Sequence, residues 1–143
     1  MDRTRTAIAI ACAAALCGLA AAADKPDFGK REFESNCAVC HGKSGKGDGP
    51  YAGMIADNQG GSDITQLSKK NGGVFPIYKV TQTIDGRFHV RAHGPREMPI
   101  WGTDYLIDAK DRLAASDIAF DPEVLVTYRI YALAEYVSRL QAK

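Results

Sequence analysis

The sequence predicts a single, all-helical domain, and three observations lead to that fold class. Apolar residues near the C-terminus recur at helical spacing, in a stripe formed by Val126, Ile130, Leu133, Val137 and Leu140. Pairs of residues that stop helices, such as Asp85-Gly86, separate the shorter apolar runs. No segment alternates convincingly between apolar and polar residues, as a strand does. A chain of 143 residues suffices for one such domain and not for two.

The composition is that of an ordinary globular protein, with 45% apolar and 24% charged residues. The formal net charge is +1, and no long run of like charge occurs. Because nucleic-acid binding depends on a basic surface, these values give no reason to expect nucleic acid as a partner.

The N-terminal 23 residues have the pattern of a secretory signal peptide. Arg3 and Arg5 precede an uncharged, alanine-rich run over residues 7–23, and we expect cleavage near Ala23. The alternative is an uncleaved membrane anchor, for which 17 apolar residues are marginal against a hydrocarbon core of about 30 Å. Cleavage would remove Cys12 and Cys17 and leave a formally neutral domain over residues 24–143, with no membrane span.

The first predicted helix of that domain runs from Pro26 to Asn36. Proline suits the first turn of a helix, and Phe28 and Phe33 are its apolar residues. This helix would deliver Cys37 at its C-terminal end.

Residues 37–41 read Cys-Ala-Val-Cys-His, and this motif predicts covalent attachment of haem c. Two thiols at this spacing can add to the two vinyl groups of one haem, and His41 then lies beneath the iron as an axial ligand. A thioredoxin-like pair would need a preceding strand, which is absent from the pattern before Cys37. A structural zinc site would need a second pair of ligands, and no cysteine follows Cys40.

The iron takes a sixth ligand unless it binds a substrate or a gas, and the candidates are Met54, His89, His93 and Met98. Met98 is favoured because Pro99 stiffens the chain directly after the thioether and Trp101 supplies a large ring to pack on the porphyrin. The Pro, Trp and Gly around it indicate a shaped loop.

The other candidates have simpler interpretations. Met54 lies only 13 residues after His41, a short path to the opposite haem face, and is interpreted as a core residue. His89 or His93 would give a bis-histidine centre of lower potential, and each is interpreted instead as a surface group or a propionate contact. Arg96 is a further candidate for pairing with a haem propionate.

A glycine-rich stretch over residues 42–49 contains Gly-Lys-Ser, but a phosphate-binding loop would need glycine at position 37, which is Cys37. The glycines are expected to let the backbone wrap tightly beneath the proximal side of the haem. The carbonyl of Pro50 is expected to accept a hydrogen bond from the second ring nitrogen of His41.

Three more helices follow. The second is capped by Ser62 or Asp63, ends at Lys70 and is stopped by residues 71–73; the third runs from Pro76 to Ile84. The last is capped by Asp121, with Pro122 in its first position. Residues 103–121 are expected to form an extended connection before it, with a short helix around residues 110–115.

Charges are locally segregated along the chain. The stretch from residue 104 to 123 holds the acids Asp104, Asp108, Asp111, Asp117, Asp121 and Glu123. The stretch from residue 79 to 96 holds the bases Lys79, Arg87, Arg91 and Arg96. A solvated surface, a docking patch for a partner, and arginine pairing with haem propionates are all consistent with this pattern.

Together these residues resemble the class I c-type cytochromes, the bacterial relatives of mitochondrial cytochrome c. The resemblance covers residues 28–102 and 123–140 and departs from the family pattern over residues 103–121. In that family the first and last helices cross closely, and the residues that match the crossing are Gly29, Phe33, Leu133 and Tyr136. The resemblance implies an all-α cytochrome c fold around one haem.

The predicted function is one-electron transfer in the periplasm by a haem with His41 and Met98 as axial ligands. The protein would act as a soluble carrier or as the haem subunit of a respiratory dehydrogenase or oxidase, with redox proteins as partners. It would not itself be an enzyme. The alternative is a peroxidase-like haem enzyme or gas sensor, in which Met98 is displaced and His89 or His93 acts as a distal acid–base group.

Overall fold

The computed structural model describes residues 26–54, 63–87 and 98–143, which form helices and turns and no strand. The α-helices are α2 (Phe28–Glu32), α3 (Ala38–His41), α4 (Leu67–Lys70), α5 (Ile77–Asp85), α6 (Trp101–Ala114) and α7 (Pro122–Arg139). A π-helical turn (Phe33–Cys37) joins α2 to α3, and 3₁₀ turns lie at Ala52–Met54 and Ile64–Gln66. The all-helical fold class is confirmed. The expected signal peptide lies outside the described residues.

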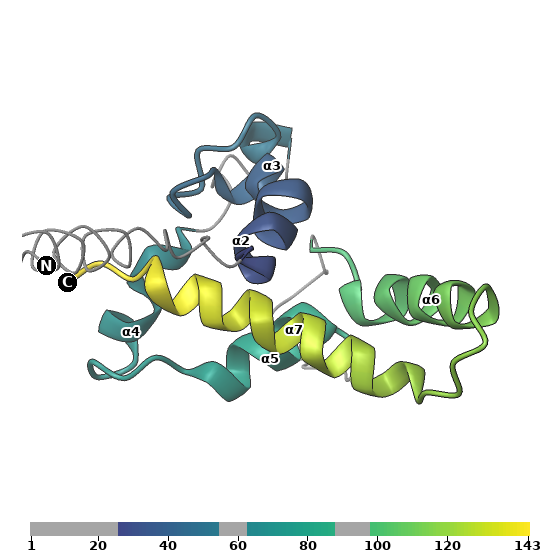
Figure 1. The fold of residues 1–143 in the computed structure, drawn as a ribbon. Coiled ribbons are helices and arrows are strands. Elements are labelled where there is room, and N and C mark those ends of the chain that lie inside the picture. The colour runs from purple at the N-terminus through teal and green to yellow at the C-terminus, as the bar shows by residue number, and fades with distance from the viewer. Residues whose placement is uncertain (1–25, 55–62, 88–97) are drawn as a thin grey trace, which may run out of the picture.

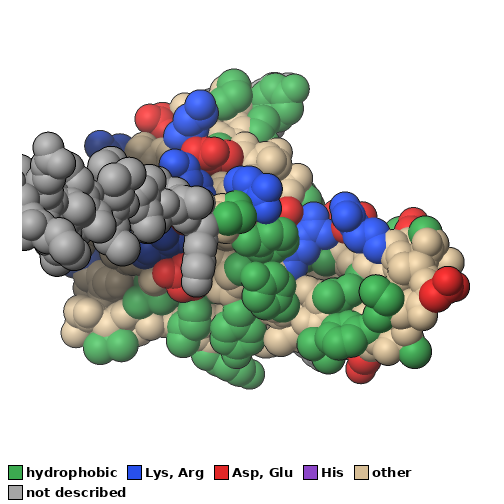
Figure 2. Space-filling view, viewed as in Figure 1, with side chains coloured by type: hydrophobic (Ala, Val, Ile, Leu, Met, Phe, Trp, Pro, Cys, Tyr) green, Lys and Arg blue, Asp and Glu red, His purple; other side chains and the backbone are tan. Residues whose placement is uncertain are grey.

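The long helix α7 runs diagonally through the molecule and packs against α2, α5 and α6 (Figure 1). The Asp121 carboxylate accepts a hydrogen bond from the Glu123 N–H at 2.9 Å, and Pro122 occupies the first turn, as predicted. Most of the predicted apolar stripe is buried, namely Val126, Ile130, Leu133 and Val137. The outward side of α7 exposes Val124, Tyr128 and Tyr131, and Figure 2 shows hydrophobic side chains along this helix.

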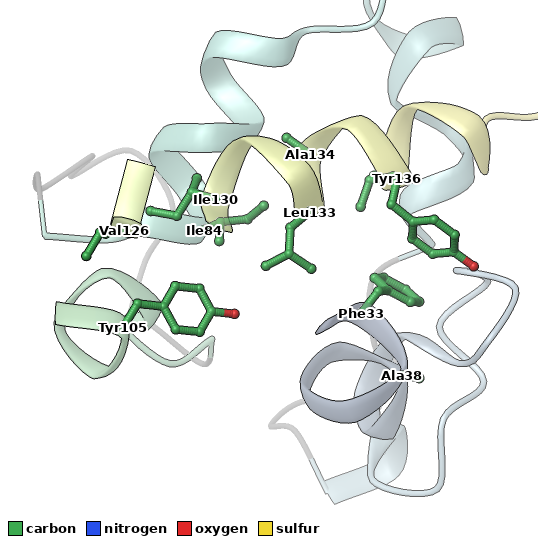
Figure 3. Close-up of a cluster of buried hydrophobic side chains, with 10 residues drawn as sticks. Phe33, Ala38, Ile84, Tyr105, Val126, Ile130, Leu133, Ala134 and Tyr136 are labelled. Atoms are coloured by element: carbon green, nitrogen blue, oxygen red, sulfur yellow. The ribbon is translucent and has the colours of Figure 1, made fainter. Parts of the chain in front are cut away.

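The crossing of α2 and α7 is as close as the resemblance implied. A Cβ atom on Gly29 would collide with the backbone oxygen of Ala132, so only glycine permits this approach. The rings of Phe33 and Tyr136 lie 5.2 Å apart between centroids, and Leu133 is 1% exposed beside them (Figure 3). The crossing therefore fixes the start of α2 against the last turns of α7.

The position of the first predicted helix is confirmed, but both of its predicted ends are wrong. It begins after Asp27, whose carboxylate caps the helix by accepting the Lys30 N–H at 2.9 Å, and Pro26 precedes the cap. It does not stop at Asn36, because the helical backbone continues through a π turn into α3. Gly42, with φ of 72°, ends it directly after the haem-attachment motif.

The second and third predicted helices are confirmed. Asp63 accepts the Thr65 N–H at 2.8 Å and so caps residues 64–70, while the other candidate cap, Ser62, lies outside the described residues. Helix α5 ends at Gly86, which has φ of 68° and donates its N–H to the Gln82 carbonyl at 3.0 Å.

The expected extended connection over residues 103–121 is wrong for most of its length. Helix α6 begins at Trp101 and ends at Ala114, so only residues 115–121 connect it to α7. Trp101, Tyr105 and Ala109 recur every four residues and turn one face of α6 to the core. Gly102 and Thr103, both poor helix formers, hid this periodicity. Trp101 and Gly102 are therefore helical and not part of a loop around Met98.

An ion-pair clamp ties the end of α5 to the start of α7, and the start of α6 lies against it. The Arg87 guanidinium bonds both carboxylate oxygens of Asp85, at 2.7 and 2.9 Å, and reaches Glu123 at the start of α7 at 2.8 Å. A Cβ atom on Gly102 would collide with the Asp85 carboxylate and approach the Arg87 Nε to 2.6 Å. Glycine thus lets α6 begin directly against the clamp. Arg87 and Glu123 stand in the two oppositely charged stretches, and their pairing with each other was not predicted.

Replacing Arg87 with methionine should destabilise the haem-loaded protein by about 2 kcal/mol, because the buried Asp85 carboxylate loses its guanidinium. Urea unfolding measures the effect. The control is Arg112→Met, which removes an exposed pair with Asp108 within α6 and should change stability by about 0.5 kcal/mol or less. Equal losses in the two variants would contradict the clamp.

Candidate haem-attachment site

The two cysteines and the histidine of the motif lie at the end of the helical segment that begins with α2. Cys37 is the last residue of the π turn, and Cys40 and His41 complete α3. Both thiols are half-buried and neither is in a disulfide. Residues three apart on a helix share a face, so the two sulfurs are presented on one side with the His41 imidazole on the adjoining residue.

The environment of Cys37 differs from that of a redox-active thiol. Burial, with smaller contributions from Glu32 and Cys40, raises the pKa of the Cys37 thiol to about 12. A thioredoxin-like pair needs the opposite shift, toward the thiolate. Over the described residues, no three His, Cys, Asp or Glu side chains are grouped as a metal site. The raised pKa of Cys37 argues against a redox-active pair.

The glycine-rich loop folds back beneath the motif and binds its backbone. The N–H groups of Gly47, Gly49 and Tyr51 donate to the carbonyls of His41, Cys40 and Val39 at 2.8, 3.2 and 2.9 Å, respectively. These bonds satisfy the carbonyls that the end of a helix leaves without partners, and so fix the turn that carries the motif.

Glycine is required at position 49, because a Cβ atom there would collide with the carbonyl oxygen of Val39 and lie 2.6 Å from that of Ala38. The loop therefore wraps tightly against the motif, and its place beneath the proximal side of the haem stays a prediction. Pro50 lies between two residues that bind the motif, and its side chain is exposed. Its bond to the His41 ring stays a prediction.

The loop is also tied to the C-terminus. The Ile64 N–H donates to the Gly45 carbonyl at 2.9 Å. The side-chain amide of Gln141 donates to the Ile64 carbonyl at 2.7 Å, and the Ala142 N–H donates to Thr65 at 2.9 Å. No sequence signal marked Gln141, because a lone glutamine near a terminus has no distinctive pattern.

Cys37, Met98 and Trp101 pack against one buried cluster, which includes Tyr105 and Leu133 (Figure 3). The first thiol, the candidate sixth ligand and the candidate porphyrin-packing ring thus border the same core, although Cys37 and Met98 lie 61 positions apart in the sequence. The Trp101 and Tyr105 rings lie 5.8 Å apart.

Several predicted site residues cannot be placed. His89, His93 and Arg96 lie outside the described residues, as does the side chain of Met54. Their roles stay predictions.

Sequence reasoning missed a charged group next to the cluster. Arg129 of α7 donates to Glu32 of the α2 segment at 2.7 Å and to Asp108 of α6 at 2.6 Å. Its guanidinium carbon lies 4.1 Å from the centre of the Tyr105 ring. Arg129 thus links α7 to α6 and to the α2 segment around Tyr105, and no sequence pattern distinguishes this tyrosine from other apolar residues.

A helical domain that presents two thiols and a histidine at this spacing, beside an apolar cluster, defines a c-type cytochrome. The chain belongs to the cytochrome c family: the family model described as Cytochrome c matches residues 27–110, more than half of the chain. The match contains the motif, Met98 and most of α6, and α7 lies beyond it. Neither a curated protein nor a solved structure gave a significant match.

Members of this family carry haem c, bound covalently with iron at its centre, and the residues of this chain fit that group. The donor set consists of two thiols free of disulfide bonding and an imidazole, and Cys37 packs against the apolar core. Within the described part of the chain, no helix has the length and apolar character needed to cross a membrane.

Proposed function

We propose that this member of the cytochrome c family is a one-electron carrier of the periplasm, with haem c attached at Cys37 and Cys40 and with His41 and Met98 as axial ligands. Haem-based electron transfer is the general activity of the family. The bound haem supplies a one-electron Fe²⁺/Fe³⁺ couple. The observation that carries the finer proposal is the packing of Met98 and Cys37 against one buried cluster.

The chain's own residues set the properties of that centre. The Met98 thioether favours ferrous iron and so raises the reduction potential. The bonds from residues 47–51 hold the turn that carries His41. The Pro50 carbonyl would accept a hydrogen bond from the His41 ring and so orient it. Trp101 packs on the porphyrin, and Arg96 pairs with a propionate. The apolar cluster keeps water from the covered side of the cofactor.

The location and partners follow from the N-terminus and the surface. Residues 1–23 direct export and are then removed, which leaves the mature domain in the periplasm. Its partners are redox proteins, met transiently or in a respiratory dehydrogenase or oxidase. Transient encounters of this kind bury less than about 1,200 Å². Arg87 is engaged by Asp85 and Glu123, so pairing within the chain accounts for this part of the basic stretch.

The proposal is tested by adding carbon monoxide to the reduced protein and to a Met98→Ala variant. We expect the variant to bind carbon monoxide rapidly and completely and the parent protein to resist it, because the thioether saturates the iron. The oxidised variant should also lose the methionine–iron charge-transfer band.

Met54→Ala serves as the control and should keep both properties of the parent. If the methionine–iron charge-transfer band survived in Met98→Ala, Met98 would not be the axial ligand. Rapid and complete binding of carbon monoxide by the parent protein at neutral pH would refute the electron-carrier proposal and favour an open distal site.

A further inference from the structure

The outward side of α7 joins side chains of α2 and α5 in one exposed aromatic face. Val124, Tyr128 and Tyr131 are 50, 60 and 53% exposed, and their spacing of four and three residues places them in a single stripe along the helix (Figure 2). The Phe28 ring of α2 lies 5.6 Å from the Tyr128 ring. Tyr78 of α5, 73% exposed, lines the same hollow as Tyr131. We call these five residues the aromatic face.

The hollow beside the aromatic face lies between α5 and α7. It has a volume of about 270 Å³, and the side chains of Tyr78 and Tyr131 form part of its lining. The clamp of Asp85, Arg87 and Glu123 supplies charged lining groups, and these are paired with one another. Because an ion entering the hollow would meet charges that are already neutralised, the hollow suits an uncharged ring better than an ion.

The area of the aromatic face is close to what one side of a protein interface needs. An aromatic side chain has roughly 200 Å² of surface, so the exposed fractions of the three tyrosines leave roughly 370 Å² open to solvent. Val124 and the half-buried Phe28 add to this area. A standard interface buries about 800 Å² on each partner, and a little over half of that, about 450 Å², is apolar. The face therefore supplies most of the apolar area that a dimer requires.

The charges of α7 beside the aromatic face are paired within the chain. Glu123 pairs with Arg87 at 2.8 Å, and Glu135 pairs with Arg139 at 3.2 Å. Arg129, which is the only charged residue between the two glutamates, is engaged by acids of α2 and α6. A strongly charged partner or an anionic membrane would need unpaired charges of one sign around the face. Residues 24–143 are formally neutral, so two copies would not repel each other.

We propose that the aromatic face joins two copies of this chain in a symmetric dimer. In a two-fold interface the same residues meet from both sides, so the stripe of one α7 packs against that of the other. Tyr128 lies at the centre of the stripe and therefore near the two-fold axis, and the hollow of each copy receives a ring from the other. The buried stripe of α7, with Leu133 and the core that Cys37 borders, faces the opposite way. The pairing therefore does not depend on which residues ligate the haem iron.

The test is the molar mass of the haem-loaded mature protein, measured by sedimentation equilibrium. We expect the mass to approach twice that of one haem-loaded chain as the concentration rises through the micromolar range. Tyr128→Glu places two like charges near the axis, one from each copy, and should weaken the dimer at least about 100-fold. Tyr131→Ser removes a ring without adding a charge and should weaken the dimer to a smaller extent.

Ile107→Glu is the matched control, because Ile107 is 56% exposed and lies two residues after the buried Tyr105, on the outward side of α6. This variant should dimerise as the parent protein does. Far-ultraviolet circular dichroism checks that each variant is folded, and Tyr131→Ser decides the test if Tyr128→Glu is not. A parent protein that stayed a single chain throughout the micromolar range would overturn the inference and leave the face to a different partner. Folded variants of Tyr128 and Tyr131 that dimerised as tightly as the parent would overturn it as well.

Discussion

Replacing Cys37 and Cys40 together with serine should give a chain that holds no haem after denaturation. Only thiols form the thioether bonds that the motif predicts, and a serine hydroxyl at the same position does not. The parent protein should keep its haem through denaturing electrophoresis and show the mass of chain plus haem. The double variant should show no haem stain and should have the mass of the mature chain alone.

The same substitution should also destabilise the fold. Cys37, Met98 and Trp101 are half-buried and lie against the core, so loss of the cofactor leaves this apolar region to water. A ligand present at a thousand times its dissociation constant stabilises the folded state by about 4 kcal/mol, and covalent attachment keeps haem at a high local concentration. We expect a loss of that order, measured by urea unfolding.

Val39→Ala is the matched control for this experiment. It changes a half-buried side chain between the two cysteines and leaves both thiols and His41 in place. Haem should remain attached, because the chemistry depends on the thiols and their spacing. A Cys37→Ser, Cys40→Ser chain that still carried haem after denaturation would refute attachment at these residues.

The elements that could be predicted are those whose ends are set by local chemistry. Asp121 and Pro122 begin α7, and Gly86 ends α5, through hydrogen bonds and backbone angles that involve only nearby residues. The haem motif is equally local, since covalent chemistry fixes its spacing. These signals can be recognised from the neighbouring residues alone.

The features that could not be predicted depend on contacts between distant residues. Helix α6 starts at Trp101 despite Gly102, because the glycine allows α6 to meet the Asp85 clamp on α5. The π turn that carries Cys37 was not foreseen, because its apolar pattern differs little from that of an α-helix. The burial of the Tyr105 hydroxyl without a hydrogen-bond partner among the described residues is visible in the structure and not in the sequence.

The crossing of α2 and α7 gives the second large effect, through the variant Gly29→Ala. Alanine has the higher helix propensity by about 1 kcal/mol, so an isolated helix would gain stability. In this protein the added Cβ would collide with the backbone oxygen of Ala132 and lie 3.2 Å from the Cβ of Tyr136. A backbone oxygen cannot rotate away, so α2 must shift, and we expect a loss of about 3 kcal/mol in the haem-loaded protein.

Gly53→Ala separates this collision from the general effect of adding a methyl group. Gly53 lies in the 3₁₀ turn Ala52–Met54, with nothing within 4 Å of an added Cβ, and its variant should unfold at the parent's urea concentration. If Gly29→Ala were as stable as Gly53→Ala, the close crossing would be contradicted. Because α2 continues through the π turn to Cys37, a shifted α2 should also move the attached haem relative to Met98. The methionine–iron band should therefore weaken in Gly29→Ala and stay unchanged in Gly53→Ala, so that one pair of variants tests both the crossing and its coupling to the haem site.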